Sequence, residues 1–118
     1  LIAYSPLALG LLARPLDRQR WPSGPRGALF RRLAPALPAL QAEMQRIAAA
    51  HGADLVAVAL NWCRAHGALP IPGLRRPEQV EQAAAALAWS LGPEERSRLD
   101  VLALGLPVRM PANPFQSA

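Results

Sequence analysis

Apolar residues recur at helical spacing through the middle of the chain. Leu37, Leu40, Met44 and Ile47 repeat three or four positions apart, with polar residues such as glutamine and arginine between them. This spacing places the four apolar side chains on one face of a helix. The pattern therefore predicts an amphipathic helix over residues 36–50.

A second helix is predicted directly after the first. Gly52 supplies a stop at the end of the first helix, since glycine readily adopts the left-handed conformation found there. Asp54 is placed to cap a helix over residues 55–66, and Gly67 ends it. These signals predict two consecutive helices joined by a short turn.

Two further helices are predicted toward the end of the chain. Pro77 stands at a first-turn position of a helix over residues 77–88, where its missing N–H does no harm. A last helix begins near Pro93, has two glutamates in its first turn, and runs to about residue 104. The proline-rich residues 107–118 are not expected to be helical.

Short apolar runs before proline predict two strands. Residues 1–4 are apolar and stop at Ser5-Pro6, as expected of a strand leaving a sheet. Residues 69–72 form the second run, and their prolines require a very short strand. Because helices separate them, the two strands are expected to pair in parallel. Such strands are normally buried in a larger sheet, so part of the architecture is expected to be missing.

A long surface loop is predicted between the first strand and the first helix. Residues 11–27 are rich in arginine, proline and glycine, which makes regular structure improbable. Loops of this length in compact domains are often functional.

Composition narrows the possible functions. The 118 residues carry a net charge of +5, and all thirteen cationic side chains are arginine. Because lysine is absent, this chain alone has no Schiff-base or lysine-assisted chemistry. The arginines are scattered except at 31–32 and 75–76, so nucleic-acid binding is not favoured. No apolar run is long enough for a membrane span, and none is expected.

The single cysteine and the first residue add two expectations. Cys63 excludes an internal disulfide, and its apolar helical neighbours predict a buried, inert thiol. The chain begins at Leu1, inside an apolar strand, with neither a basic leader nor a cleavage site. These features predict that the sequence starts partway through a longer protein.

The second strand leads into a candidate anion site. Gly73, Leu74, Arg75 and Arg76 precede the predicted helix N-terminus, where backbone N–H groups and the helix dipole favour an anion. The turn after the first strand, at residues 4–7, is expected to converge on the same place. Two such rims predict one ligand between them, and we expect a dinucleotide. Solvated surface arginines remain the alternative interpretation.

Three motifs in order resemble the aldo/keto reductases, most closely the plant-plastid and cyanobacterial members. They are Ile2 through Leu12, Val58 through Cys63, and Pro70 through Arg76, followed by a similar ending at Asn113-Pro114-Phe115-Gln116. The resemblance implies an α/β fold in which residues 1–118 are the C-terminal part of a (β/α)8 TIM barrel. The two strands would be its seventh and eighth, and a whole barrel needs about 250 residues.

The resemblance implies hydride transfer from NADPH to a small carbonyl substrate. The family's tyrosine acid, with its lysine, aspartate and histidine, comes from earlier strands outside this chain. We therefore expect no catalytic residue here and no activity from the chain alone. His51 and His66 are interpreted as cations or donors near the last carbonyls of helices.

The resemblance also assigns cofactor-binding residues. Tyr4 would stack on the nicotinamide ring, although a half-buried strand-end aromatic is the alternative interpretation. The remaining positions would contact the pyrophosphate and ribose (Ser5, Leu7, Gly10), the adenosine 2′-phosphate (Gly73, Leu74, Arg75, Arg76) and the neighbouring part of the cofactor (Gln79). At the adenine edge, Gln82 could reach the base, but Ala83 stands where the family has a hydrogen-bonding residue.

Two other functions stay open at this point. A truncated nucleotide-binding or protein-interaction remnant would associate through exposed sheet edges. A basic helical interaction protein would bind no ligand. For the leading interpretation the expected partners are NADPH and a carbonyl compound, and the resemblance makes plastid or cytoplasm the expected compartments.

Overall fold

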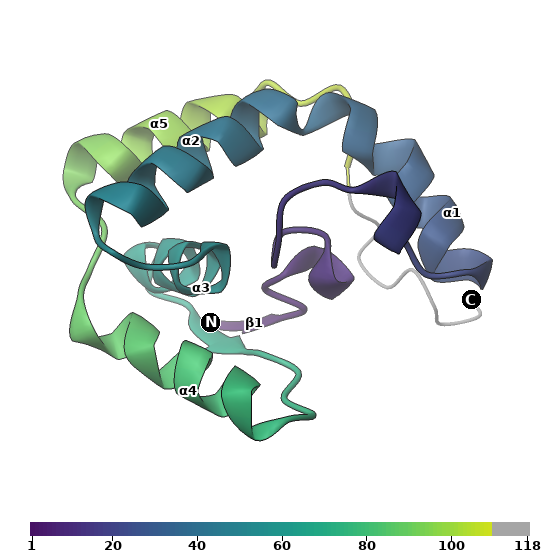
Figure 1. Cartoon of the computed structure of the whole chain (residues 1–118). Coiled ribbons are helices and arrows are strands. Elements are labelled where there is room, and N and C mark those ends of the chain that lie inside the picture. Colours follow the sequence, from purple (N-terminus) through teal and green to yellow (C-terminus); the bar gives the residue numbers. More distant parts are fainter. Residues whose placement is uncertain (110–118) are drawn as a thin grey trace.

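The computed structural model describes residues 1–109, which form two short strands surrounded by helices (Figure 1). The strands and α-helices are β1 (Ile2–Tyr4), α1 (Gly24–Leu33), α2 (Pro38–Ala50), α3 (Leu55–Ala65), β2 (Leu69–Ile71), α4 (Pro77–Ala85) and α5 (Pro93–Leu104). Single 3-10 turns are η1 (Ala8–Gly10), η2 (Arg18–Arg20), η3 (Ala34–Ala36) and η4 (Ala86–Ala88). The motif at Asn113 through Gln116 lies outside the described residues.

The predicted parallel pair is confirmed. Ile2 pairs with Leu69 and Tyr4 with Ile71, and the helices α1, α2 and α3 lie between the two strands in sequence. Because parallel neighbours point the same way, both strands deliver their following turns to one edge of the sheet. This edge is where the candidate site lies.

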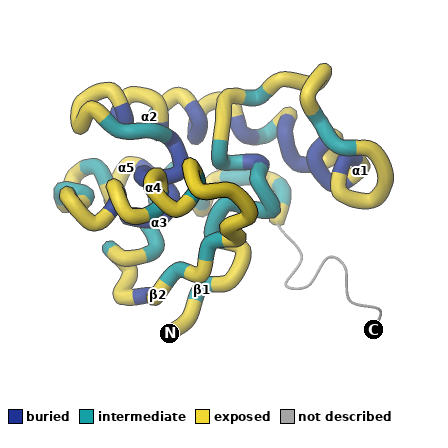
Figure 2. Tube along the Cα trace, turned by 60° about the horizontal axis from the view of Figure 1, so that its bottom comes forward, coloured by how far each residue is buried: buried dark blue, intermediate teal, exposed yellow. Residues whose placement is uncertain are grey.

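The prediction that these strands are buried is wrong for the described residues. Ile2, Tyr4, Leu69 and Ile71 are each more than half exposed. Along both strands exposed residues alternate with partly buried ones, so the two-stranded sheet is covered on only part of its surface (Figure 2). The chain thus presents an apolar sheet surface of the kind that normally packs against another layer.

The core lies between helices rather than over the sheet. Met44 and Ile47 of α2, Val58 of α3 and Leu99 of α5 are completely buried where these three helices meet. The apolar stripe predicted for α2 is therefore confirmed. In Figure 1, α5 runs alongside α2, with α3 beneath them and α4 on the other side of α3.

Helix caps follow the predictions closely. The Asp54 side chain accepts a hydrogen bond from the backbone N–H of Ala57 at 2.9 Å, which starts α3. Gly52 adopts φ +60° and Gly67 φ +73°, the left-handed conformation that ends α2 and α3. The helix predicted over 77–88 narrows to a 3-10 turn in its last three residues.

The prediction of a structureless loop over residues 11–27 is wrong at its end. Helix α1 begins at Gly24 with Pro25 in its first turn, and η2 interrupts the loop. Leu29, Phe30 and Leu33 of α1 are buried in the main core. The predicted helix over 36–50 correspondingly starts two residues later, after η3.

Within residues 1–109, no helix combines the length and apolar character needed to cross a lipid bilayer.

Candidate functional site

Two adjoining hollows open at the sheet edge where β1 and β2 end. The first has a volume of about 820 Å³ and lies between the turn after β1, the following loop and the turn after β2. The second, of about 320 Å³, continues along the start of α4. Leu7, Gly73 and Gln79 line both hollows, so the two form one groove. A groove of this size can hold an extended small molecule.

The first rim is a tightly wound turn after β1. Ser5, Ala8 and Leu9 have positive φ angles of 54°, 49° and 59°, and Gly10 has a φ of 99°. Backbone hydrogen bonds join Ala8 N–H to the Ser5 carbonyl at 2.9 Å and Gly10 N–H to the Leu7 carbonyl at 3.0 Å. Left-handed backbone at non-glycine residues costs about 1–2 kcal/mol each and is concentrated at functional sites. The rim is therefore a strained, fixed shape.

The second rim runs from β2 into α4, and its backbone donors differ from the prediction. The N–H groups of Arg75 and Arg76 are not available to an anion, because the Gln79 Oε1 atom accepts both, at 2.6 and 3.1 Å. The Gln79 side chain thus caps the N-terminus of α4, the helix to which it belongs. Anion binding at this rim would depend on the exposed guanidinium groups of Arg75 and Arg76 rather than on free N–H groups.

Almost all predicted cofactor-binding residues come together. Ser5, Gly10 and Arg75 line the first hollow, and Leu74, Arg76 and Gln82 line the second. Leu7, Gly73 and Gln79 belong to both. The two rims, about seventy residues apart in sequence, therefore face each other across one groove.

Tyr4 is the exception. Its side chain is 64% exposed at the end of β1 and lines neither hollow. Ala83, which stands where the family has a hydrogen-bonding residue, also lies outside the walls of both hollows.

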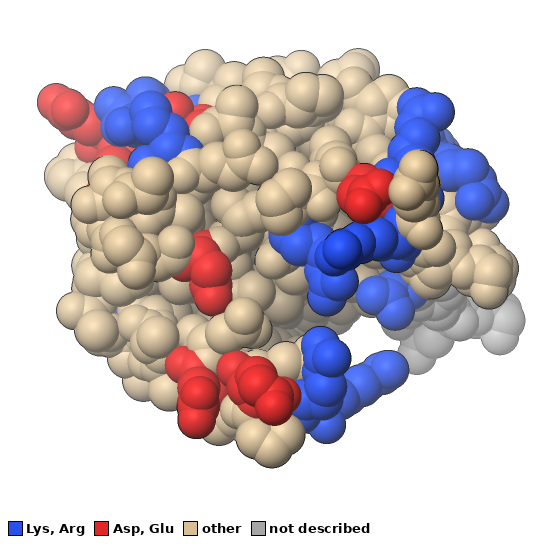
Figure 3. All heavy atoms as spheres, in the orientation of Figure 1, with Lys and Arg blue, Asp and Glu red and all other residues tan. Residues whose placement is uncertain are grey.

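Sequence reasoning did not predict that three more arginines, two from the loop and one from the first turn of α1, also reach the groove. Arg14 and Arg20 line both hollows, and Arg26 lines the first. Figure 3 shows basic side chains gathered around the hollowed right-hand part of this face. The only signal was the arginine-rich composition of residues 11–27, which has no periodicity that would point the side chains anywhere.

A buried glutamine holds the loop against the helices. Gln41 is 3% exposed, and its Nε2 atom donates to the carbonyls of Leu11 at 3.3 Å and Arg14 at 3.0 Å. Its Oε1 atom accepts from the N–H of Leu16 at 3.1 Å. This one side chain satisfies three backbone groups that would otherwise be buried without partners. It thereby fixes the chain on both sides of Arg14.

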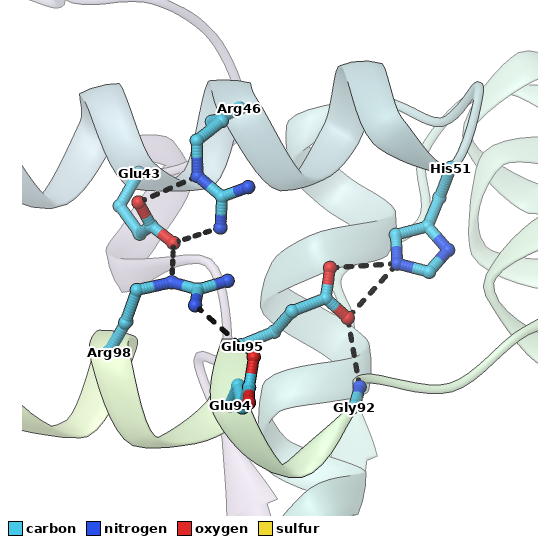
Figure 4. A network of polar contacts seen from close by, with 7 residues as sticks. All are labelled: Glu43, Arg46, His51, Gly92, Glu94, Glu95 and Arg98. Carbon is cyan, nitrogen blue, oxygen red and sulfur yellow. Dashed lines mark hydrogen bonds and ion pairs between the residues drawn. The ribbon is translucent and has the colours of Figure 1, made fainter.

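The two histidines contact carboxylates of α5 and lie away from the groove. His51 Nε2 lies 2.9 Å from Glu95 Oε2 (Figure 4). The His51 ring also stacks on Trp89, with ring centroids 4.2 Å apart. His66 Nε2 lies 2.7 Å from Asp100 Oδ1. Their side chains therefore join α5 to the ends of α2 and α3, instead of serving the last carbonyls of those helices.

These contacts shift the titration of the carboxylates. Hydrogen bonds from Arg46 and Arg98 lower the pKa of Glu43 to about 2. Burial disfavours the charged form of Glu95, but hydrogen bonds from Gly92 N–H and His51 outweigh it and lower the pKa (Figure 4). For Asp100, bonds from Trp62 and His66 likewise outweigh burial and lower the pKa. All three carboxylates act as structural anions.

Cys63 is half-buried, which corrects the prediction of a fully buried thiol. Burial raises the pKa of the thiol, and it is therefore a weak nucleophile. Within residues 1–109, no cluster of three or more histidine, cysteine, aspartate or glutamate side chains could hold a metal ion.

Comparisons with known proteins agree with the motifs in the two rims. The sequence model of the aldo/keto reductase family matches residues 1–103. The chain is also 39% identical over 117 residues to a chloroplastic pyridoxal reductase of Arabidopsis thaliana. That match covers 99% of this chain but 32% of the plant protein, so the chain spans about a third of the relative's length.

Proposed function

Because this chain belongs to the aldo/keto reductase family, we propose that it forms the cofactor-binding C-terminal portion of an NADP(H)-dependent carbonyl reductase. In this proposal β1 and β2 are the seventh and eighth strands of a (β/α)8 barrel. The single observation that carries the proposal is the convergence of the two turns, Ser5–Leu7 and Gly73–Arg76, on one groove. Ligands of such barrels bind at the C-terminal ends of the strands, which is where this groove lies.

The residues present fit a phosphorylated dinucleotide. The groove combines a hollow of about 820 Å³ with a smaller one, which suits a ligand made of two linked halves. Gly10 has no side chain at the first rim, and a Cβ there would come within 2.9 Å of Arg26 Nη2. The guanidinium groups at the second rim match phosphate oxygens in charge and shape.

Each rim would hold a different part of the cofactor. Arg75 and Arg76 would bind the 2′-phosphate that distinguishes NADPH from NADH, and Gln82 would lie near the adenine. The wound turn at Ser5–Gly10 would position the pyrophosphate and ribose, and Tyr4 would support the nicotinamide ring. When bound, the cofactor supplies the hydride that reduces a carbonyl to an alcohol.

The groups that protonate the carbonyl would come from elsewhere in the complete protein. The chain contains no lysine, and both histidines are engaged with carboxylates of α5. We therefore assign this chain the binding of cofactor and not proton transfer. The exposed apolar surface of β1 and β2 would be covered by the other strands of the barrel, in keeping with the third of the plant relative that the chain spans.

The assignment is tested by cofactor affinity in the protein that contains this chain. Arg75→Gln should weaken NADPH binding by about tenfold or more, because a charge-assisted phosphate contact contributes about 1.5–3 kcal/mol. NADH binding should hardly change. Arg31→Gln is the matched control, since Arg31 is exposed on α1 and lines neither hollow. Equal losses for NADPH and NADH would refute the 2′-phosphate assignment.

The substrate and the compartment are proposed from the relative. Reduction of aldehydes by NADPH, with pyridoxal as the first compound to try, is the expected activity of the complete protein. A plastid location is proposed because the relative is described as chloroplastic. Turnover of aldehydes with NADPH, measured by the loss of cofactor absorbance, tests the reaction itself.

A further inference from the structure

Helix α4 makes little packing contact of its own. It begins directly after the second rim, and Gln82, which lines the smaller hollow, belongs to it. None of its residues is buried, and only Gln79 and Ala83 are partly so. Ala83 packs against a small apolar cluster formed mainly by α3, on the side of α3 away from α2 and α5 (Figure 1). An alanine methyl group buries little apolar area, so packing alone holds this helix weakly.

Two polar side chains of α3 contact the end of α4. Asn61 is 2% exposed, and its Nδ2 atom donates to the Ala86 carbonyl at 2.9 Å. The Arg64 Nη1 atom donates to the same carbonyl at 3.1 Å and also to the Oδ1 atom of Asn61. The two side chains therefore bond each other as well as the end of the helix. We call Asn61 and Arg64 the α3 clamp.

The α3 clamp supplies what the C-terminal end of α4 lacks. Ala86 caps this end, where carbonyl groups have no partner within the helix. The residue is 1% exposed, so water has little access to it. The last turn of α4 contains no basic residue, and the Arg64 guanidinium places a positive charge at the negative end of the helix dipole. Both the hydrogen bonds and the charge thus come from α3.

The clamp acts on the groove from a distance. Asn61 and Arg64 line neither hollow. The same helix α3 contributes Val56 to the smaller hollow, where Gln82 of α4 is also found. A helix of nine residues is about 14 Å long and turns as one body. Fixing its C-terminal end therefore restricts the direction of its axis, and with it the place of its first turn.

We propose that Asn61 and Arg64 are positioning residues for the second rim. They hold α4 in the direction that brings Arg75, Arg76 and Gln82 to the groove, and they contact no ligand themselves. This inference rests on the proposed function, because it concerns the affinity of the same groove for its cofactor. When the binding arrangement is populated for only part of the time, the apparent affinity falls by that fraction. Releasing the clamp should therefore weaken cofactor binding.

The test compares Arg64→Met and Asn61→Leu with Asp100→Ala in the protein that contains this chain. Arg64 is exposed and methionine keeps most of its apolar stem, so this variant is expected to fold even if Asn61→Leu does not. Asp100→Ala is the matched control, because the Asp100 carboxylate attaches α5 to α3 and bonds no part of α4 among the described residues. Amide hydrogen exchange should accelerate over residues 77–88 in the clamp variants, and over α5 in the control.

Cofactor titrations measure the consequence for binding. We expect the clamp variants to bind NADPH about three- to tenfold more weakly, as when α4 keeps its place for about a third to a tenth of the time. The loss for NADH should be smaller, because NADH has no 2′-phosphate for the arginines of the second rim. The KM for NADPH should rise while kcat does not fall. Arg64→Lys, which can still donate to the Ala86 carbonyl, should restore most of the affinity.

Clamp variants that bind NADPH as tightly as the wild type would overturn the positioning role, even with faster exchange in α4. An equal loss of affinity in Asp100→Ala would also overturn it, since general destabilisation would then be the cause. If the wild type binds neither dinucleotide, the proposed function fails and the positioning role with it. If Arg75→Gln discriminates between NADPH and NADH while the clamp variants behave like Asp100→Ala, only the positioning role is refuted.

Discussion

The Nε2 atom of Gln41, inside helix α2, donates a hydrogen bond to the backbone carbonyl of Leu11, 3.3 Å away at the start of the loop. The same amide also bonds the backbone of Arg14 and Leu16. A single buried side chain therefore joins the core to the loop whose arginines, Arg14 and Arg20, line the groove. Stability and the shape of the site depend on one residue.

Replacing Gln41 by methionine should destabilise the protein and release the loop. The change leaves two carbonyls and one N–H without partners, at a cost of about 1–3 kcal/mol in the free energy of unfolding. Trypsin should cut faster after Arg18 and Arg20, and urea unfolding should shift to lower concentration. Gln45→Met is the control, because Gln45 is exposed on the same helix. Equal trypsin sensitivity in both variants would contradict the anchoring role.

Gly27 should not tolerate even alanine. A Cβ at this position would lie 1.9 Å from the backbone oxygen of Pro22, so the loop would have to move away from α1. Overpacking of this kind costs about 1–3 kcal/mol, measured as a lower midpoint of thermal unfolding. In the control, Gly105→Ala, the nearest atom would be 3.4 Å away, and a much smaller change is expected. A Gly27→Ala protein as stable as the control would argue against the close contact.

Acid should weaken the contact between α2 and α5. Arg46 and Arg98 lower the pKa of Glu43 to about 2 in the folded state, below the ordinary value of a glutamate. The unfolded chain therefore takes up the proton first as pH falls. The resulting stability is present above about pH 5 and is lost progressively toward pH 2.

The measurement is the free energy of unfolding at several pH values for the wild type and Glu43→Gln. The variant should be less stable at neutral pH and should lose less stability between about pH 5 and pH 2. Glu81→Gln, on an exposed position of α4, should retain the wild-type pH dependence. Parallel curves for Glu43→Gln and the wild type would show that the Glu43 contacts contribute nothing.

Asp100 should contribute more to the attachment of α5 than the exposed Glu94 of the same helix. It accepts from Trp62 Nε1 at 2.8 Å and lies 2.7 Å from His66 Nε2. Asp100→Ala leaves the half-buried indole N–H without its acceptor, at a cost of about 1–3 kcal/mol. Amide hydrogen exchange should accelerate in α5. Glu94→Ala, whose side chain is 92% exposed, should leave exchange unchanged.

Sequence patterns predicted the elements whose signals are local. The apolar stripe was sufficient to predict α2, and Asp54 was sufficient to predict the start of α3, because helical periodicity and capping act within a few residues. Helix α1 was not predicted, because glycine and proline, which occupy positions 24, 25 and 27, normally interrupt helices. Here Pro25 occupies the first turn, where proline is tolerated, and Gly27 allows close contact with Pro22.

In the candidate site, too, the features with local sequence signals were predicted and those that depend on distant contacts were not. The two rims could be predicted because each is a short motif at the end of a strand. The arginines could not, because they reach the groove through long-range contacts. Arg14 lies in the part of the loop that Gln41 anchors, and Arg26 lies in the first turn of α1, whose start was not predicted. The capping of α4 by Gln79 was missed for a related reason, since a glutamine near a helix start is compatible with either a ligand contact or a backbone contact.

The pairing of Ile2 with Leu69 has a consequence for biosynthesis. The first rim leaves the ribosome long before the second, so a nascent chain carries a wound, arginine-flanked turn that has nothing opposite it. Closing so long a stretch of chain is slow compared with forming the helices in between. The groove proposed for the cofactor would therefore form in one late step, after translation has passed α4. A nascent chain stalled earlier would hold its helices but not yet the groove.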